Sequence, residues 1–365
     1  MTGTVINYYA GGNTALGFQS FFESNLQGLK RLYILKGGPG TGKSTLMKKI
    51  GEEWKDRGYR IEYIHCSSDN NSIDGVIIRE LGVGVVDGTA PHVIEPIAPG
   101  AVEEYVNLGE AWDSKKLTSH KEEIIDLTKE ISKSFQTAYQ LFNEGLKIHD
   151  EWEKIYISNF NVTEANKLAD ELIDEFFGGV QLNKKADVKH RFLGAATPKG
   201  PVDFIQNLTA DIPHRYFIKG RPGSGKSTIL KKIAAKAEDL GYDVEIYHCG
   251  FDPNSLDMVI MRELGIAIFD STAPHEHFPD RETDQIIDLY PRLIKEGTDE
   301  KYSEELNEII ARYSAKMKEA TTHLAKAKEL HDKLENIYSS AMNFSVVNDH
   351  YERIRKEIIE IEKSM

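Results

Sequence analysis

Long apolar segments, cysteines and an excess of basic residues are all lacking from this sequence of 365 residues. No run of 18 or more apolar residues occurs, so we expect no membrane-spanning helix. The only cysteines are Cys66 and Cys249, and residues 1–7 show no basic segment followed by an apolar one. Both features favour a reduced, cytoplasmic protein. The net charge of −13 argues against a general nucleic-acid-binding surface.

A glycine-rich stretch that fits the pattern G-x-x-x-x-G-K-[ST] occurs twice, and we call residues 37–42 the first loop and residues 220–225 the second loop. An apolar segment precedes each loop and a helix-like segment follows it. In this strand–loop–helix context, backbone N–H groups and the helix N-terminus bind phosphate. The residues assigned to nucleotide binding are Gly37, Gly38, Pro39, Gly40, Thr41, Gly42, Lys43, Ser44 and Thr45, and Gly220, Arg221, Pro222, Gly223, Ser224, Gly225, Lys226, Ser227 and Thr228.

The two loops belong to a tandem duplication of the chain. Lys43 and Lys226 lie 183 residues apart (226 − 43), and the same offset aligns residues 37–50 with 220–233 at 10 of 14 positions. Residues 65–92 match 248–275 at 17 of 28 positions without a gap. We therefore predict two domains, residues 1–186 and 187–365.

Each half alternates strand-like and helix-like segments, which predicts an α/β fold with a parallel, three-layer sheet and a ligand at the carboxyl ends of its strands. Four segments are predicted to be helical outside the two loop helices: residues 18–26, 72–81, 202–208 and 255–264. Residues 103–178 and 283–363 are rich in Glu, Lys, Leu and Ile at spacings of three and four. They predict helical hairpins or a small bundle, either packed on the sheet or projecting as an arm.

An aspartate ends the third predicted strand of each half. Asp87 and Asp270 each follow four mostly apolar residues, which is the Walker B pattern for a carboxylate that binds Mg²⁺. Ser44 and Ser227 would supply the hydroxyl ligands of the same ions, and Lys43 and Lys226 would reach the β- and γ-phosphates.

Further polar residues follow the predicted strands, each with two interpretations. His92 and His275 could act as general bases, or only pin the loop that contains them. Asp69 and Asp252 could bind a phosphoryl acceptor, whereas the Asn-Ser pairs that follow them are typical of helix N-caps. Arg79 and Arg262 could face the γ-phosphate or make structural ion pairs.

These motifs resemble those of the P-loop NTPase superfamily. More narrowly, residues 9–14, 37–45 and 87–92 with their second copies resemble a family of bacterial tandem P-loop proteins described as ATPase or nucleotide kinase-like. The superfamily implies ATP and Mg²⁺ as ligands. Many hydrolytic members carry Glu after the Walker B aspartate, whereas this chain has Gly88 and Ser271.

Three functions therefore stay open. The first is a Mg²⁺-dependent ATPase with two nucleotide sites, arranged as a monomeric pseudo-dimer or in a homo-oligomer. The second is a small-molecule or nucleotide kinase, because the usual glutamate is missing. The third is an ATP-gated interaction module whose helical regions bind a protein partner. Membrane and nucleic-acid partners are not expected.

Overall fold

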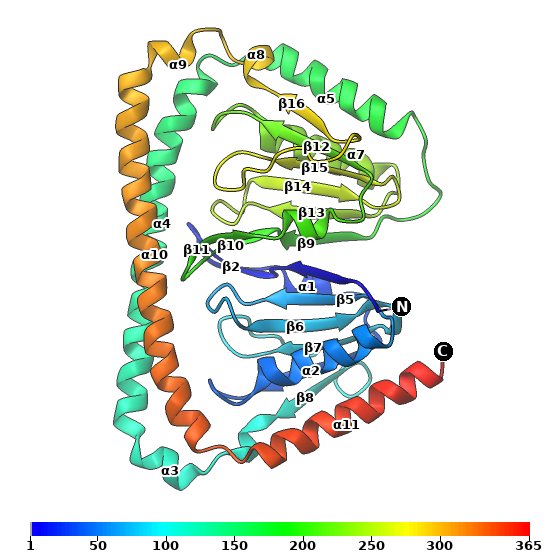
Figure 1. Cartoon of the computed structure of the whole chain (residues 1–365), viewed down its shortest axis with the longest axis vertical. Helices are drawn as coiled ribbons and strands as arrows, with labels where there is room; N and C mark the ends of the chain where they lie inside the picture. Colours follow the sequence, from blue (N-terminus) through cyan, green and yellow to red (C-terminus); the bar gives the residue numbers. More distant parts are fainter. Residues whose placement is uncertain (1) are drawn as a thin grey trace.

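The computed structural model describes residues 2–365, and it contains two α/β units joined along one side by a pair of long helices (Figure 1). Each unit holds a six-stranded sheet. The paired helices, α4 (Lys121–Ile157) and α10 (Ser303–Ser340), run antiparallel past both sheets. No helix within residues 2–365 is both long and apolar enough to cross a membrane.

The two sheets repeat one topology. The first has the strand order β1–β5–β6–β7–β4–β8, and the second has the equivalent order β9–β13–β14–β15–β12–β16. The strands of the first sheet are β1 (Val5–Tyr8), β5 (Ile61–His65), β6 (Ile73–Ile78), β7 (Val83–Asp87), β4 (Arg31–Lys36) and β8 (Glu103–Asn107). Those of the second are β9 (Val188–Phe192), β13 (Val244–His248), β14 (Leu256–Met261), β15 (Ile266–Asp270), β12 (His214–Lys219) and β16 (Gln285–Asp288).

The predictions of helices at residues 72–81 and 255–264 were wrong, and the prediction of a parallel sheet is confirmed only in part, because three of the five strand pairings in each sheet are parallel. These segments form β6 and β14, which run antiparallel to both of their neighbours and make each sheet mixed. All six residues of β6 and of β14 are buried. A short apolar run buried on both faces has no period of two, so it cannot be told from a buried helix by its pattern.

Two other segments differ from the predictions. Residues 18–26 and 202–208 each begin as the second strand of a hairpin, and only their later residues are helical. The hairpins are β2 (Gly11–Thr14) with β3 (Gly17–Ser20) and β10 (Gly194–Thr197) with β11 (Gly200–Asp203), followed by α1 (Phe22–Leu26) and α6 (Ile205–Leu208). The predicted helical regions also begin with edge strands, β8 and β16, which pair in parallel with β4 and β12.

The last helix of each half packs on the sheet of the other half. Helix α5 (Val162–Phe177) buries Leu168, Leu172 and Phe176 in one core with α7 (Lys226–Asp239) and the second sheet. Helix α11 (Phe344–Lys363) buries Ile354 and Ile358 against α2 (Lys43–Asp56) and the first sheet. The helical regions thus follow one unit in sequence and complete the core of the other.

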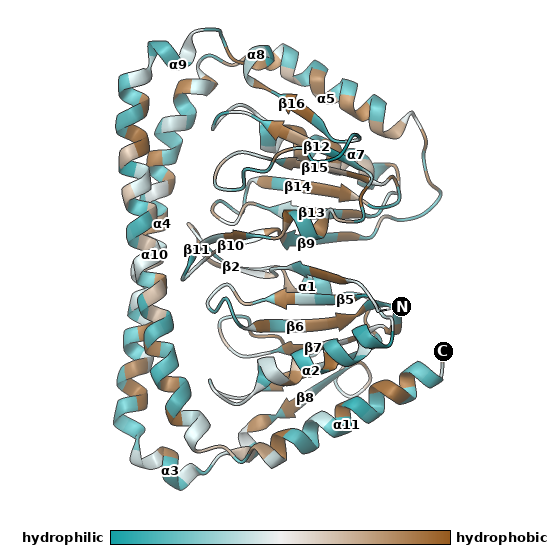
Figure 2. Ribbon diagram, viewed as in Figure 1, coloured by the Kyte–Doolittle hydropathy of each residue, from teal (hydrophilic) through white to brown (hydrophobic). Residues whose placement is uncertain are grey.

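The long helices pair with each other through their apolar faces and leave mainly hydrophilic residues on the outside (Figure 2). Ala138 and Phe142 of α4 pack with Ala320 and Leu324 of α10 in one buried cluster. Partly exposed ion pairs flank it, such as Lys316 with Glu144 at 2.7 Å. The sequence left open whether the helical regions pack on a sheet or project as an arm; α5 and α11 pack on the sheets, and α4 with α10 runs alongside both units instead of projecting.

Edges of the two sheets meet at β1 and β9. Tyr9 and Phe192 exchange two backbone hydrogen bonds of 3.0 and 2.9 Å. Nearby, the buried guanidinium of Arg191 donates to Glu62 at 3.1 Å and to Asn25 at 2.7 Å. Both acceptors belong to the other half of the chain, so a charged hydrogen-bond network fixes the contact between the units.

Candidate nucleotide site

The first loop connects the end of β4 to the start of α2 and brings three predicted site residues together. Gly40 and Gly42 have φ angles of +68° and +87°, a region that favours glycine. The Lys43 ammonium donates to the carbonyl oxygens of Gly37 and Gly38, both at 2.8 Å, and lies 3.4 Å from the Asp87 carboxylate. Lysine, aspartate and loop backbone therefore converge at the N-terminus of α2.

The second loop repeats this geometry between β12 and α7. Gly223 and Gly225 have φ angles of +71° and +88°. The Lys226 ammonium lies 3.2 Å from the Asp270 carboxylate and donates to the Thr272 hydroxyl at 3.1 Å. In both halves the threonine two residues after the aspartate donates to that carboxylate from its N–H and its hydroxyl.

The groups at each loop fit a phosphate anion with a magnesium ion. The first helical hydrogen bond of α2 runs from the Leu46 N–H to the Gly42 carbonyl oxygen at 2.9 Å. The N–H groups of Lys43, Ser44 and Thr45 come before it, so they have no acceptor within the helix. Such N–H groups and an ammonium bind anions. Ser44 and Asp87 offer the hydroxyl and carboxylate oxygens that Mg²⁺ prefers.

A buried aspartate that the sequence interpretation assigned to a helix faces this site in each half. Asp74 and Asp257 lie on β6 and β14, and they are only 6% and 7% exposed. Burial raises the pKa of Asp257 to about 6, and burial also raises the pKa of Asp74. Oxygen and nitrogen atoms of Asp74, Asp87 and His92 lie within 4.8 Å of one another. An aspartate within an apolar strand would have indicated a site residue, but the prediction of a helix for these segments hid this signal.

The two candidate histidines differ in their partners. Both ring nitrogens of His92 are buried without a hydrogen-bond partner among the described residues, and Nε2 lies 3.9 Å from Asp74. His275 instead pairs with Asp203 at 3.4 Å. Burial lowers the pKa of His275, but the Asp203 and Asp257 carboxylates raise this pKa above its usual value overall. The equivalent of Asp203 in the first half is Ser20, which explains the difference.

Asp69 and Asp252 organise turns. The Asp69 carboxylate accepts hydrogen bonds from the Asn71 N–H and the Ser72 hydroxyl, both at 2.9 Å. Asp252 accepts equivalent bonds of 3.1 and 3.0 Å. The N-cap interpretation of the Asn-Ser pairs was wrong, because a strand follows them.

Arg79 and Arg262 lie away from the loops, at the opposite ends of the strands in each sheet. Arg79 donates to Glu62 at 2.9 and 2.8 Å, and Arg262 donates to Glu245 at 2.7 and 3.2 Å. Because β6 and β14 are antiparallel, their carboxyl ends point away from the carboxyl ends of the parallel strands. This excludes the γ-phosphate interpretation and leaves the structural one.

Helices from the opposite half cover both loops. A Cβ atom at Gly40 would lie 2.6 Å from the carbonyl oxygen of Glu335 near the end of α10. A Cβ atom at Gly223 would lie 2.7 Å from the carbonyl oxygen of Glu153 near the end of α4. Glu153 and Glu335 each follow a repeated His-Asp pair, His149-Asp150 and His331-Asp332, but no functional pattern in the sequence marked either glutamate.

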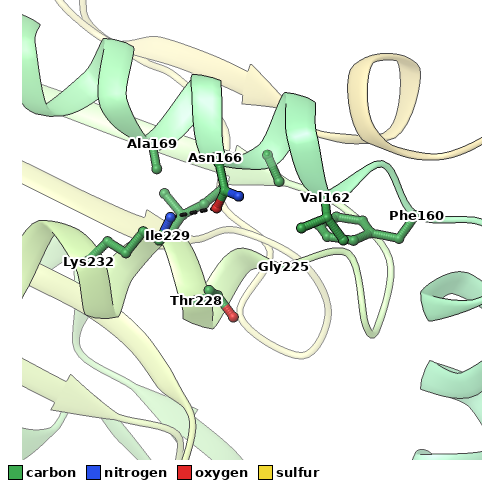
Figure 3. Close-up of a pocket in the computed structure, with 9 residues that line it drawn as sticks. Phe160, Val162, Asn166, Ala169, Gly225, Thr228, Ile229 and Lys232 are labelled. Atoms are coloured by element: carbon green, nitrogen blue, oxygen red, sulfur yellow. Dashed lines mark hydrogen bonds between the residues drawn. The ribbon is translucent and has the colours of Figure 1, made fainter.

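A small cavity of about 80 Å³ lies beside the second loop, between α5 and α7 (Figure 3). Phe160 and Gly225 line one end, and Lys232 donates to Asn166 at 2.6 Å across the other. Typical pockets for small molecules enclose about 300 Å³ or more. This cavity is therefore too small to enclose a nucleoside.

Comparison with known proteins gives one distant similarity. The chain is 25% identical over 192 residues to the chromosomal replication initiator protein DnaA of Aquifex aeolicus, across 52% of this chain. The match spans only 41% of DnaA. No family model matches the sequence, and no solved structure matches it.

Proposed function

We propose that the protein is a Mg²⁺-dependent ATPase with one nucleotide site in each half of the chain. The observation that carries this proposal is the twofold convergence of loop glycines, lysine and aspartate at a helix N-terminus, with the Lys43–Asp87 and Lys226–Asp270 pairs at 3.4 and 3.2 Å. The partial similarity to DnaA supports the same activity.

Each residue type has one role in this proposal. Loop N–H groups and the lysine hold the phosphates, and the metal ion, bound by Ser44 with Asp87 or by Ser227 with Asp270, would neutralise phosphate charge. Thr89 and Thr272 orient the aspartates through their hydrogen bonds. The kinase alternative is less favoured, because the hydrogen-bonded turns already engage both oxygens of Asp69 and of Asp252.

Replacing both Lys43 and Lys226 by alanine is expected to abolish binding of magnesium ATP, because each site loses the ammonium that neutralises phosphate charge. Titration calorimetry should give two bound nucleotides per wild-type chain, one for each single variant and none for the double variant. Lys318→Ala, at an exposed position in the middle of α10, is the control and should bind two. Unchanged binding by the double variant would contradict the proposal.

A nucleotide-gated interaction through the long helices is a second candidate, favoured because α10 ends against the first loop and α4 against the second. Magnesium ATP should then change the rate of amide hydrogen exchange several-fold in residues 150–160 and 330–341. These residues form the helix ends that contact the loops, so a nucleotide bound at a loop would touch them. The middle of each helix should keep its exchange rate. Exchange that is identical with and without nucleotide at both helix ends would contradict this candidate.

A further inference from the structure

We propose that Glu153 and Glu335 are catalytic residues supplied in trans, each accepting a proton at the loop of the opposite half. Glu153, on α4 of the first half, would serve the second loop. Glu335, on α10 of the second half, would serve the first loop. This inference rests on the proposed ATPase function and names the base that the sequence lacks after Asp87 and Asp270.

The first support is a repeated motif at matching places. His149, Asp150 and Glu153 present nitrogen and oxygen atoms within 4.8 Å of one another, and so do His331, Asp332 and Glu335. Both sets have the order His-Asp-x-x-Glu and lie near the end of a long helix. In each set the histidine Nδ1 lies close to the glutamate, at 3.9 and 3.8 Å.

The second support is the direct contact of each glutamate with a loop. Besides the carbonyl contacts described above, the Glu153 carboxylate lies near the Gly223 N–H and the Lys226 ammonium, both of which lower its pKa. Burial and the neighbouring Asp150 and Asp252 outweigh them, so the pKa of Glu153 is raised overall. A carboxylate with a raised pKa is suited to accept a proton near neutral pH.

At the first site, a lysine of α10 joins the cluster. Lys328 of α10 reaches Asp69 of the first half at 3.5 Å and also pairs with Asp332. Burial lowers the pKa of Lys328, but the hydrogen bond to Asp332 and the negative charges of Asp69 and Glu335 raise it overall. Asp332 is therefore engaged by Lys328, whereas Glu335 is the motif residue whose backbone contacts the first loop.

The other carboxylates are worse placed for the same task. Asp69 and Asp252 accept hydrogen bonds from their own turns, and Asp87 and Asp270 face the lysines. Asp74 and Asp257 are buried beneath the loops. Asp299 also contacts the second loop, but Arg221 already donates two hydrogen bonds to its carboxylate.

The proposed step is hydrolysis. The oxygen of a water molecule forms a bond to the γ-phosphorus of ATP, and the bond from that phosphorus to the β,γ-bridging oxygen breaks. ADP leaves with the bridging oxygen, the γ-phosphoryl group becomes inorganic phosphate, and one proton of the water passes to the glutamate.

The test isolates one site at a time in the full-length chain. In a Lys226→Ala background, Glu335→Gln should lower kcat for ATP by about 100-fold or more, the usual contribution of a general base. In a Lys43→Ala background, Glu153→Gln should do the same. The dissociation constant of magnesium ATP should stay within about twofold of its background value, and the bound nucleotide recovered after desalting should be ATP rather than ADP.

Matched control variants lie on the same helices. Glu329→Gln on α10 and Glu151→Gln on α4 remove exposed carboxylates that pair with Lys333 and Arg312. They should keep kcat and binding. Full activity of the Glu335→Gln and Glu153→Gln variants would overturn the inference, as would a loss of binding that equals the loss of turnover. A wild-type chain that neither binds nor hydrolyses ATP would overturn the proposed function itself, and this result is distinguishable from the others.

Discussion

Replacing Arg191 by leucine is expected to lower the free energy of unfolding by about 3 to 5 kcal/mol, the usual effect of removing one partner of a buried ion pair. Arg191 is 3% exposed, and its guanidinium lies over the Tyr8 ring as well as beside Glu62. The variant leaves Glu62, 5% exposed, with less positive charge. It also breaks the hydrogen bond to Asn25 that joins the two halves.

Chemical denaturation at neutral pH measures this effect, with Arg312→Leu as the control. Arg312 makes an exposed ion pair with Glu151 at 2.6 Å, so its loss should cost about 1 kcal/mol or less. A loss for Arg191→Leu no larger than that of the control would show that the interface network adds little stability.

The same network predicts how stability depends on pH. Burial raises the pKa of Glu62, but Arg191 and Arg79 outweigh burial and lower this pKa from 4.5 to about 2. The stabilisation from this ionised group is therefore complete above about pH 4.5 and is lost as the pH falls towards 2. Arg191→Leu should raise the pKa of Glu62 and make the loss of stability in this acid range shallower.

Replacing Ile354 of α11 by alanine is expected to lower the free energy of unfolding by about 2 to 5 kcal/mol, the usual effect of a large-to-small change in a core. Ile354 is 0% exposed and packs in the core of the first sheet. The destabilised region should therefore be the N-terminal half, although the mutation lies near the C-terminus.

A substitution at Leu172 of α5 tests the same exchanged packing in the opposite direction. It is 5% exposed in the core of the second sheet, and Leu172→Ala should weaken that sheet. Native-state hydrogen exchange separates the two outcomes: Ile354→Ala should speed exchange in β4 and β7, and Leu172→Ala should speed it in β12 and β15. Faster exchange in the half that contains the mutated residue in sequence would contradict the exchanged packing.

Local patterns predicted much of each half. The glycine loops, their preceding strands and their following helices depend on neighbouring residues, so β4 with α2 and β12 with α7 lie where the sequence predicted them. The duplication was also readable, because two copies of one fold keep the same spacing between motif residues. Contact between Lys43 and Asp87 followed from parallel strands ending at the same edge of a sheet.

Other features could not be read from the sequence. Residues 73–78 carry apolar side chains on both faces, so the pattern does not reveal a strand or its antiparallel direction. Because β6 is antiparallel to its neighbours, Asp74 near its start lies at the site, and Arg79 after its end lies at the opposite ends of the strands. Glu153 lies 70 positions before Gly223 (223 − 153), and Glu335 lies 295 positions after Gly40 (335 − 40), so no local pattern records these contacts.

The amino-acid sequence by itself determined two repeated α/β units, each with a glycine loop, a lysine and a following aspartate, because the conformation of a loop and of the strand and helix beside it depends on nearby residues. Only the tertiary structure decided that α5 and α11 exchange sheets and that each loop is covered by the other half. The physical reason is that an apolar helix face can be buried on either of two similar sheets. The antiparallel pairing of α4 with α10 delivers each helix end to the opposite unit.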